Sequence, residues 1–413
     1  MKLLHFSPLA FLISFLVLLS SKQVASHPNL DKFLRCVSQR SNSLDQISDV
    51  IYTRANCSSF KSVLRSYIRN ERFNQSTTPK PLAIVTPLDE SHVRATVVCA
   101  KYHGLQLRVR SGGHDYEGLS YVSHDPFVLL DMFNLRAIDI DIASETAWAQ
   151  AEGVTQIVDQ WQRVAPNTDP DLFIRAQPRV VKGSEYEGNK TVQVRFIALY
   201  LGRAKNLVRL VKKSFPLLGL DHKDCIEMPW INSTLYWFGM PLGNPLEELA
   251  SRTWKPRFYA KYRSDYVQQP IPEEGLDAIW KKLLEFEDLY LQFNPYGGMM
   301  SQVPENATAF PHRAGNLFKI QHLSVWSEPG EENARRYTDA SKRLYDALAP
   351  YVSKNPREHF LNYRDLDVGT NENGNSTFGA AYFKGNLPRL IATKARVDPD
   401  NFFRYEQSIP LTI

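Results

Sequence analysis

Cysteine is scarce in this sequence, with four residues among 413: Cys36, Cys57, Cys99 and Cys225. No two of them have the spacing of a zinc site, so we expect no metal. The sequence also lacks a long block of lysine or arginine, and its 49 basic residues nearly balance the 44 acidic ones. A chain of this kind is not expected to bind nucleic acid.

No long apolar run is present at the N-terminus that could span a membrane. The run from Phe11 to Leu19 is interrupted by Ser14 and is too short for a span. It follows Lys2 and precedes the small residues 24–26, a pattern that predicts a secretory signal peptide over residues 1–26. An N-terminal anchor is the less favoured alternative.

Glycosylation motifs recur along the sequence. Any one of them can occur by chance, but several together with a predicted signal peptide support glycosylation. Six Asn-x-Ser/Thr sites have no proline in the middle position, and such sites are modified where they face water in secreted proteins. They are Asn56, Asn74, Asn189, Asn232, Asn306 and Asn375. The sequence therefore predicts a secreted glycoprotein.

The length favours two domains over one compact core. Before Glu152, the pattern predicts a small α+β unit with strands at Leu82–Val85, Leu105–Arg110 and Phe127–Asp131, a helix at His92–Tyr102 capped by Asp89 or Ser91, and a hairpin over residues 137–151. After Gly153, long strands alternate with amphipathic helices. This predicts one large, mainly antiparallel sheet with helices on one face. Its strands are expected at Leu172–Gln177, Thr191–Leu201, Tyr259–Val267, Tyr290–Met300 and Phe318–Trp326.

A glycine-rich loop follows the predicted strand that ends at Arg110. This Gly loop, residues 110–121, reads RSGGHDYEGLSY. Glycines tolerate positive φ, and successive backbone N–H groups in such a loop form a cavity that attracts anions. The loop is thus suited to a phosphorylated cofactor, with the imidazole of His114 beside it. A tight turn with an exposed histidine is the alternative, and a short glycine motif alone does not decide between them.

The complete sequence of the loop resembles the flavin-attachment loop of plant berberine bridge enzyme-like oxidases, in the vanillyl-alcohol oxidase group of flavoproteins. The resemblance continues through FPHRAGNLFKIQ (residues 310–321), LNYRDLD (361–367), YFKGN (382–386) and VDPDNFFRYEQSIP (397–410). It implies an α+β fold with a two-lobed FAD-binding domain of the PCMH type and a substrate domain whose large antiparallel sheet is covered by helices. The expected boundaries are 27–152 for the first part of the FAD domain, 153–355 for the substrate domain, and 356–413 for a segment that returns to the FAD domain.

The resemblance also assigns roles to residues. It implies a covalent bond from His114 to FAD, and further cofactor contacts from Arg110, Ser111, Gly112, Gly113, Asp115, Tyr382 and Asn386. It pairs Cys36 with Cys99. Cys225 is expected to be unpaired, with a bridge to Cys57 left open as an alternative.

The resemblance places Tyr363 in the active site as a general base, with Lys319 and Gln321 holding a substrate oxygen. A tyrosine acts as a base only if its pKa is lowered, which a neighbouring cation can do. Lys319 and Gln321 are two positions apart, so on a strand they share a face. Without the resemblance, a core aromatic and a surface charge would be the simpler interpretations.

The implied reaction is the oxidation of an alcohol or related group of a small plant metabolite or sugar, with hydride transfer to flavin N5 and O₂ as acceptor. The expected protein is a monomer with a small-molecule substrate.

One large part of the family pattern is missing. After Ala151, the family continues with a Cys-Pro-Thr-Val-Gly motif, whose cysteine forms a second flavin bond, and then with a glycine-rich run. Here Glu152-Gly153-Val154 passes directly to the start of the substrate domain. We therefore expect a truncated member, from a mis-spliced or misassembled gene. A secreted glycoprotein that no longer retains FAD is the alternative to an active oxidase.

Overall fold

The computed structural model describes residues 27–41, 44–135, 145–150, 154–182, 190–237, 239–240, 243–250, 257–286, 288–371 and 377–412. The expected signal peptide lies outside these ranges, as does the first half of the expected hairpin. None of the described helices combines the length and the apolar character that crossing a membrane requires.

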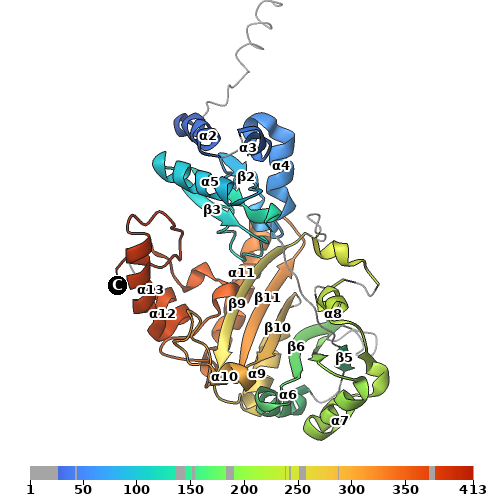
Figure 1. Cartoon of the computed structure of the whole chain (residues 1–413). Helices are drawn as coiled ribbons and strands as arrows, with labels where there is room; N and C mark the ends of the chain where they lie inside the picture. Colours follow the sequence, from blue (N-terminus) through green and yellow to red (C-terminus); the bar gives the residue numbers. More distant parts are fainter. Residues whose placement is uncertain are drawn as a thin grey trace, which may run out of the picture.

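A small lobe at the top of Figure 1 contains a four-stranded sheet in the order β1-β2-β4-β3. β2 and β3 both run parallel to β4, whereas β1 is antiparallel to β2. The strands are β1 (Ile51–Thr53), β2 (Ala83–Val85), β3 (Gln106–Arg110) and β4 (Phe127–Asp131), and the helices are α2 (Pro28–Arg40), α3 (Leu44–Asp49), α4 (Cys57–Ser66) and α5 (Glu90–Tyr102).

Two sequence predictions are confirmed in this lobe. The carboxylate of Asp89 caps α5 by accepting hydrogen bonds from the backbone amides of Ser91 and His92. Cys36 on α2 and Cys99 on α5 form a disulfide. The disulfide and the buried residues around it fasten α2 to the helix that covers the sheet.

The large sheet has seven strands in the order β8-β5-β7-β6-β10-β11-β9, and every neighbouring pair is antiparallel. Its strands are β5 (Glu145–Gln150), β6 (Leu172–Lys182), β7 (Lys190–Tyr200), β8 (Cys225–Ile226), β9 (Tyr259–Val267), β10 (Leu289–Pro295) and β11 (Phe318–Trp326). The predicted antiparallel sheet is thus confirmed.

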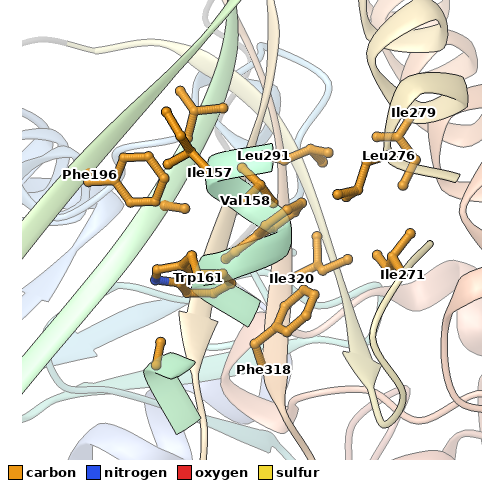
Figure 2. Packing of buried hydrophobic residues seen from close by; sticks show 14 of the residues in the cluster. Ile157, Val158, Trp161, Phe196, Ile271, Leu276, Ile279, Leu291, Phe318 and Ile320 are labelled. Atoms are coloured by element: carbon orange, nitrogen blue, oxygen red, sulfur yellow. The ribbon is translucent and has the colours of Figure 1, made fainter. Parts of the chain in front are cut away.

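Helices cover one face of this sheet because its strands alternate between apolar and polar residues. α6 (Val154–Val164), α7 (Ala204–Ser214), α9 (Glu273–Leu283) and α11 (Glu331–Ala347) turn their apolar sides toward it. Figure 2 shows Trp161 of α6 packed among residues of the strands, close to Phe318. The opposite residues of each strand face away from this core, which leaves the other face of the sheet available for a site.

Two strand predictions need correction. β5 pairs with β7 and β8, so the second half of the expected hairpin belongs to the large sheet and not to the small lobe. The alternating pattern identified a strand but not its partner. The expected strand to Met300 ends at Pro295 and is followed by a short helix, α10 (Gly298–Gln302). Gly297 and Gly298 both have positive φ, which interrupts the extended chain.

The C-terminal segment lies beside both the small lobe and the large sheet (Figure 1). It contains α12 (Thr377–Phe383) and α13 (Leu387–Val397). Beyond α13, Phe402 packs into the core of the small lobe and Glu406 forms an ion pair with Arg108 of β3. The end of the tail thus contacts the small lobe. Helix α8 (Trp230–Trp237), which lies between β8 and β9 in the chain, is near β5 (Figure 1).

Candidate active site

The face of the large sheet opposite the covering helices carries a row of polar side chains. Lys319 and Gln321 of β11 share this face, as the two-residue spacing predicts, and both are buried. The amide of Gln321 accepts a hydrogen bond from Gln292 of β10 at 3.2 Å. Gln292 in turn accepts hydrogen bonds from Arg175 and Gln177 of β6. These residues form a hydrogen-bonded polar floor across three strands.

Lys319 is surrounded by aromatic rings. Its Nζ lies 3.6 Å from the ring centre of Phe360 and 4.1 Å from that of Tyr363. Within the described ranges no carboxylate lies at ion-pair distance from this amine. Burial, with a smaller effect from the charge of Arg175, lowers the pKa of Lys319 to about 7. The side chain is only 6% exposed, which excludes the interpretation of Lys319 as a surface charge.

Tyr363 lies on a 3-10 turn, residues Leu361–Tyr363, and not on a strand. Burial raises the pKa of its hydroxyl, and the nearby charge of Arg175 offsets only part of this effect. The structure thus places a cation beside Tyr363, as expected, but the net direction of the shift is upward. A protonated hydroxyl is the form that this environment favours at neutral pH.

Tyr116 of the Gly loop connects the loop to the polar floor. Its hydroxyl accepts a hydrogen bond of 2.7 Å from Gln321. Its ring stacks on Tyr363, with centres 5.4 Å apart, and lies 4.2 Å from the ring of Tyr262 of β9. We did not assign Tyr116 a role from the sequence, although its position two residues after His114 was a usable signal. Arg175 was also missed, because alternation identifies the face of a strand but not its neighbours.

His114 lies at the surface of the Gly loop and reaches Arg69, whose Nη1 is 3.2 Å from Nδ1 of the imidazole. Desolvation of the ring, together with the charge of Arg69, lowers the pKa of His114. The neutral imidazole is therefore the form present near pH 7. Asp115 stabilises the loop by accepting hydrogen bonds from the backbone amides of Glu117 and Ser120.

A cleft of about 530 Å³ opens beside His114. Its lining combines the Gly loop and β3 with the 361–364 turn and the C-terminal tail, so three distant segments meet there. Three arginines contribute to its wall: Arg108, Arg364 and Arg404. Arg108 is paired with Glu406 and Arg404 with Asp125, so carboxylates offset part of this positive charge. The cleft reaches the turn that carries Tyr363.

Of the expected cofactor contacts, His114 and Asp115 line the cleft, and the other six do not. Arg110 is fully buried, where it forms an ion pair with Asp131 and donates to the backbone oxygens of Val63 and Leu64. The hydroxyl of Tyr382 accepts a hydrogen bond from the amide of Asp365. Asn386 donates to backbone oxygens of residues 305 and 308. Most polar atoms of these three side chains form contacts within the fold, whereas Nε of Arg110 has no hydrogen-bond partner among the described residues. Their contacts with a cofactor stay predictions.

The expected glycosylation sites have different environments. Asn306 is exposed, whereas Asn74 and Asn232 are partly buried, and Asn74 donates a hydrogen bond to Glu71. The side chain of Asn56 lies outside the described part of the chain, as do residues Asn189 and Asn375. Cys225 is a free, partly buried cysteine.

Comparison with known proteins agrees with this geometry. A family model described as "FAD binding domain" matches residues 81–163, and one described as "Berberine and berberine like" matches residues 359–410. Berberine bridge enzyme-like 3 of Arabidopsis thaliana is 37% identical over 519 residues, covering 96% of this chain and 96% of the relative. Berberine bridge enzyme-like 9 of the same plant is 37% identical over 526 residues, covering 97% and 98%.

Solved structures give the same result. BBE-like #28 from Arabidopsis thaliana superposes with a TM-score of 0.81 and 29% identity, covering 93% of this chain and 100% of that chain. Phl p 4, a grass pollen allergen with glucose dehydrogenase activity, superposes with a TM-score of 0.81 and 30% identity, covering 92% and 100%. The chain therefore belongs to the berberine bridge enzyme-like family of FAD-binding oxidoreductases.

Proposed function

We propose that the chain is a secreted FAD-dependent oxidoreductase that oxidises an alcohol or related group of a small plant metabolite or sugar. The observation that carries this proposal is the contact of Tyr116 with both Gln321 and Tyr363. Through it, the loop that holds His114 and the polar floor of the large sheet form one continuous site. The glucose dehydrogenase activity named for Phl p 4 supports a sugar as one substrate class.

The residues around the cleft fit a cofactor with phosphate groups. Two nitrogens of Arg108, Nε and Nη1, are buried and have no hydrogen-bond partner among the described residues. Buried donors without partners are costly, so an anionic ligand would stabilise them. The volume of the cleft falls within the range of roughly 300–1,000 Å³ that is usual for ligand sites. We propose that Arg108, Arg364 and Arg404 face the phosphates, with Ser111, Gly112, Gly113 and Asp115 forming the loop that carries His114.

When bound, FAD supplies the two-electron redox chemistry, with O₂ as the proposed acceptor and His114 as the proposed point of covalent attachment. The protein contributes the placement of the substrate and the handling of one proton. Gln321 is suited to donate to or accept from a substrate oxygen. Lys319, whose pKa is about 7, is well matched to accept the proton of a substrate hydroxyl near neutral pH. Tyr363, with its raised pKa, is proposed to orient the same oxygen as a hydrogen-bond donor.

We also propose that a segment of the family is missing after Ala151, including the cysteine of the second flavin bond. The alignment with berberine bridge enzyme-like 3 extends over 519 residues, which exceeds the 413 residues of this chain. The relative therefore contains sequence with no counterpart here. Val109 on the edge strand β3 and Phe403 are 45% and 47% exposed beside the cleft, as expected where a covering part is absent.

Secretion is part of the proposal. The signal-like residues 1–26, the exposed sequon at Asn306 and the Cys36–Cys99 disulfide all suit an oxidising, extracellular route. We expect the secreted protein to be a monomer.

The same exposed apolar residues favour a second candidate, a secreted glycoprotein of this family that does not retain FAD. A turnover assay separates the two. The purified chain is incubated with FAD, a panel of sugars and plant alcohols, and an artificial electron acceptor. Substrate-dependent reduction of the acceptor that falls strongly in Lys319→Met and Tyr363→Phe would support the oxidoreductase. No reduction with any substrate, with wild type and variants equally inactive, would favour the glycoprotein.

A further inference from the structure

A buried ion cluster lies beneath the tyrosines of the site. Nζ of Lys261, on β9, is 2.6 Å from a carboxylate oxygen of Glu117 and 2.7 Å from one of Asp365. The exposed fraction of each of these three side chains is 4% or less. Glu117 belongs to the Gly loop and Asp365 to the C-terminal segment, so one ammonium group joins three parts of the chain.

Each member of this cluster is close in sequence to a tyrosine of the site. Glu117 follows Tyr116, Lys261 precedes Tyr262, and Asp365 lies two residues after Tyr363. Consecutive residues of a strand point to opposite faces, so Lys261 and Tyr262 lie on opposite sides of β9. The ions therefore meet on one side of this edge strand, and the three tyrosine rings pack together on the other.

We infer that Lys261 is a positioning residue that fixes the Gly loop and the 361–367 turn to β9, and thereby brings Tyr116 into contact with Tyr363 and Gln321. This inference deepens the proposed function, and its consequence for turnover rests on that function. Its structural content does not depend on flavin or substrate. The side chain itself is screened from the site by the strand, so it acts through the tyrosines.

The two carboxylates depend on Lys261 to different degrees. Asp365 has a second strong partner, because Nη1 of Arg263 lies 2.6 Å from its other oxygen. Glu117 has only Arg72 as a further cation among the described residues, at 3.8 Å. Loss of the ammonium group would leave Glu117 buried with little compensation, which is costly. The Gly loop should therefore loosen more than the turn.

Hydrogen exchange of backbone amides tests this directly in the full chain. Each segment contains a backbone amide with a known hydrogen-bond acceptor, so its exchange can be followed. The amide of Tyr121 donates to the backbone oxygen of Gly118, and the amide of Asp365 donates to the hydroxyl of Tyr382. In Lys261→Met we expect exchange to accelerate by about tenfold or more in residues 111–121 and by less in 361–367. Exchange in α9 and α11 should remain as in the wild type.

Lys342→Met is the matched control, because it removes an equal charge from an exposed pair with Asp346 on α11. It should leave both segments unchanged. The inference is overturned if Lys261→Met leaves residues 111–121 unaffected, or if exchange rises evenly throughout the chain, which would indicate a general loss of stability.

If Lys261→Met does not fold, Glu117→Gln provides the second test. We expect faster exchange in residues 111–121 with the 361–367 turn unchanged, and no change in the loop would overturn the inference. The two proposals can fail separately. A colourless protein with the expected exchange pattern would contradict the oxidoreductase function alone, and an active flavoprotein with unchanged exchange would contradict the role of Lys261 alone.

Discussion

Lys319 illustrates how the site tunes a single group. Its amine lies among the rings of Phe360 and Tyr363, and a ring face attracts a cation less strongly than a carboxylate does. Burial therefore dominates, and the pKa of Lys319 falls from 10.5 to about 7. This places the change between amine and ammonium near neutral pH, where it can serve proton transfer from a hydroxyl.

The shift has a consequence for stability. Between about pH 7 and pH 10.5, the unfolded chain carries a proton on Lys319 that the folded chain does not. The contribution of Lys319 to stability therefore rises with pH across this window, by an amount on the order of a few kcal/mol. In Lys319→Met this contribution should be absent. Urea unfolding at pH 7 and pH 9.5 checks the prediction, and an equal gain in stability for both proteins would contradict it.

The Gly loop shows how a structural element constrains its sequence. Gly113 has φ of +65°, and a Cβ at this position would lie 2.6 Å from the backbone oxygen of Tyr67. The residue therefore needs both the conformational freedom and the small size of glycine. A glycine at this position allows the loop to pack closely against residues 63–69. Arg69 lies in the same region and is within hydrogen-bond distance of His114.

Gly113→Ala is expected to destabilise the protein by roughly 2–4 kcal/mol, because strain from positive φ and a backbone clash act together. Gly219→Ala is a matched control, since Gly219 has a similar φ of +62° with no atom near the added Cβ. The control should cost about 1 kcal/mol. Denaturant midpoints measure both, and equal losses would show that the contact with Tyr67 has no effect.

The sequence predicted the bounds of strands better than it predicted which strands pair with one another. β9 and β11 begin and end at the predicted residues, because their flanking segments interrupt the extended pattern clearly. β5 was placed in the wrong sheet, since a strand's alternation contains no information about its hydrogen-bonding neighbour. The same limit applies to the site: Lys319 and Gln321 were predicted to share a face, while the contribution of Arg175 from β6 depends on a strand order that alternation does not encode.

Motif resemblance predicts the loops of the site, but it does not predict what each side chain contacts within the fold. Arg110 and Tyr382 lie within motifs of the family, and in the fold Arg110 forms an ion pair with Asp131 while Tyr382 accepts a hydrogen bond from Asp365. Membership in a family motif indicates that a residue type is needed at a position. The surroundings of the side chain in the fold determine what that side chain contacts. Tyr116 lies in the same loop, and its ring is turned toward the polar floor.

At the scale of the whole molecule, the small lobe is stabilised by contacts between segments that are distant in the sequence. The Cys36–Cys99 disulfide closes a loop of 63 residues. The entropy removed from the unfolded chain corresponds to roughly 4 kcal/mol. We expect Cys36→Ala/Cys99→Ala to lose about 2–4 kcal/mol in denaturant unfolding. Cys225→Ser, which removes a free thiol, should have little effect, and a similar loss in both variants would contradict the assignment.

The central claim is that the chain keeps a flavin site at His114 although part of the family's FAD domain is missing. The most direct measurement is the visible spectrum of the secreted, purified chain before and after acid precipitation. The account predicts a yellow pellet with flavin absorbance from the wild type and from His124→Ala, an exposed histidine outside the site, and a colourless pellet from His114→Ala. A colourless wild-type protein, or a yellow pellet from His114→Ala, would contradict it.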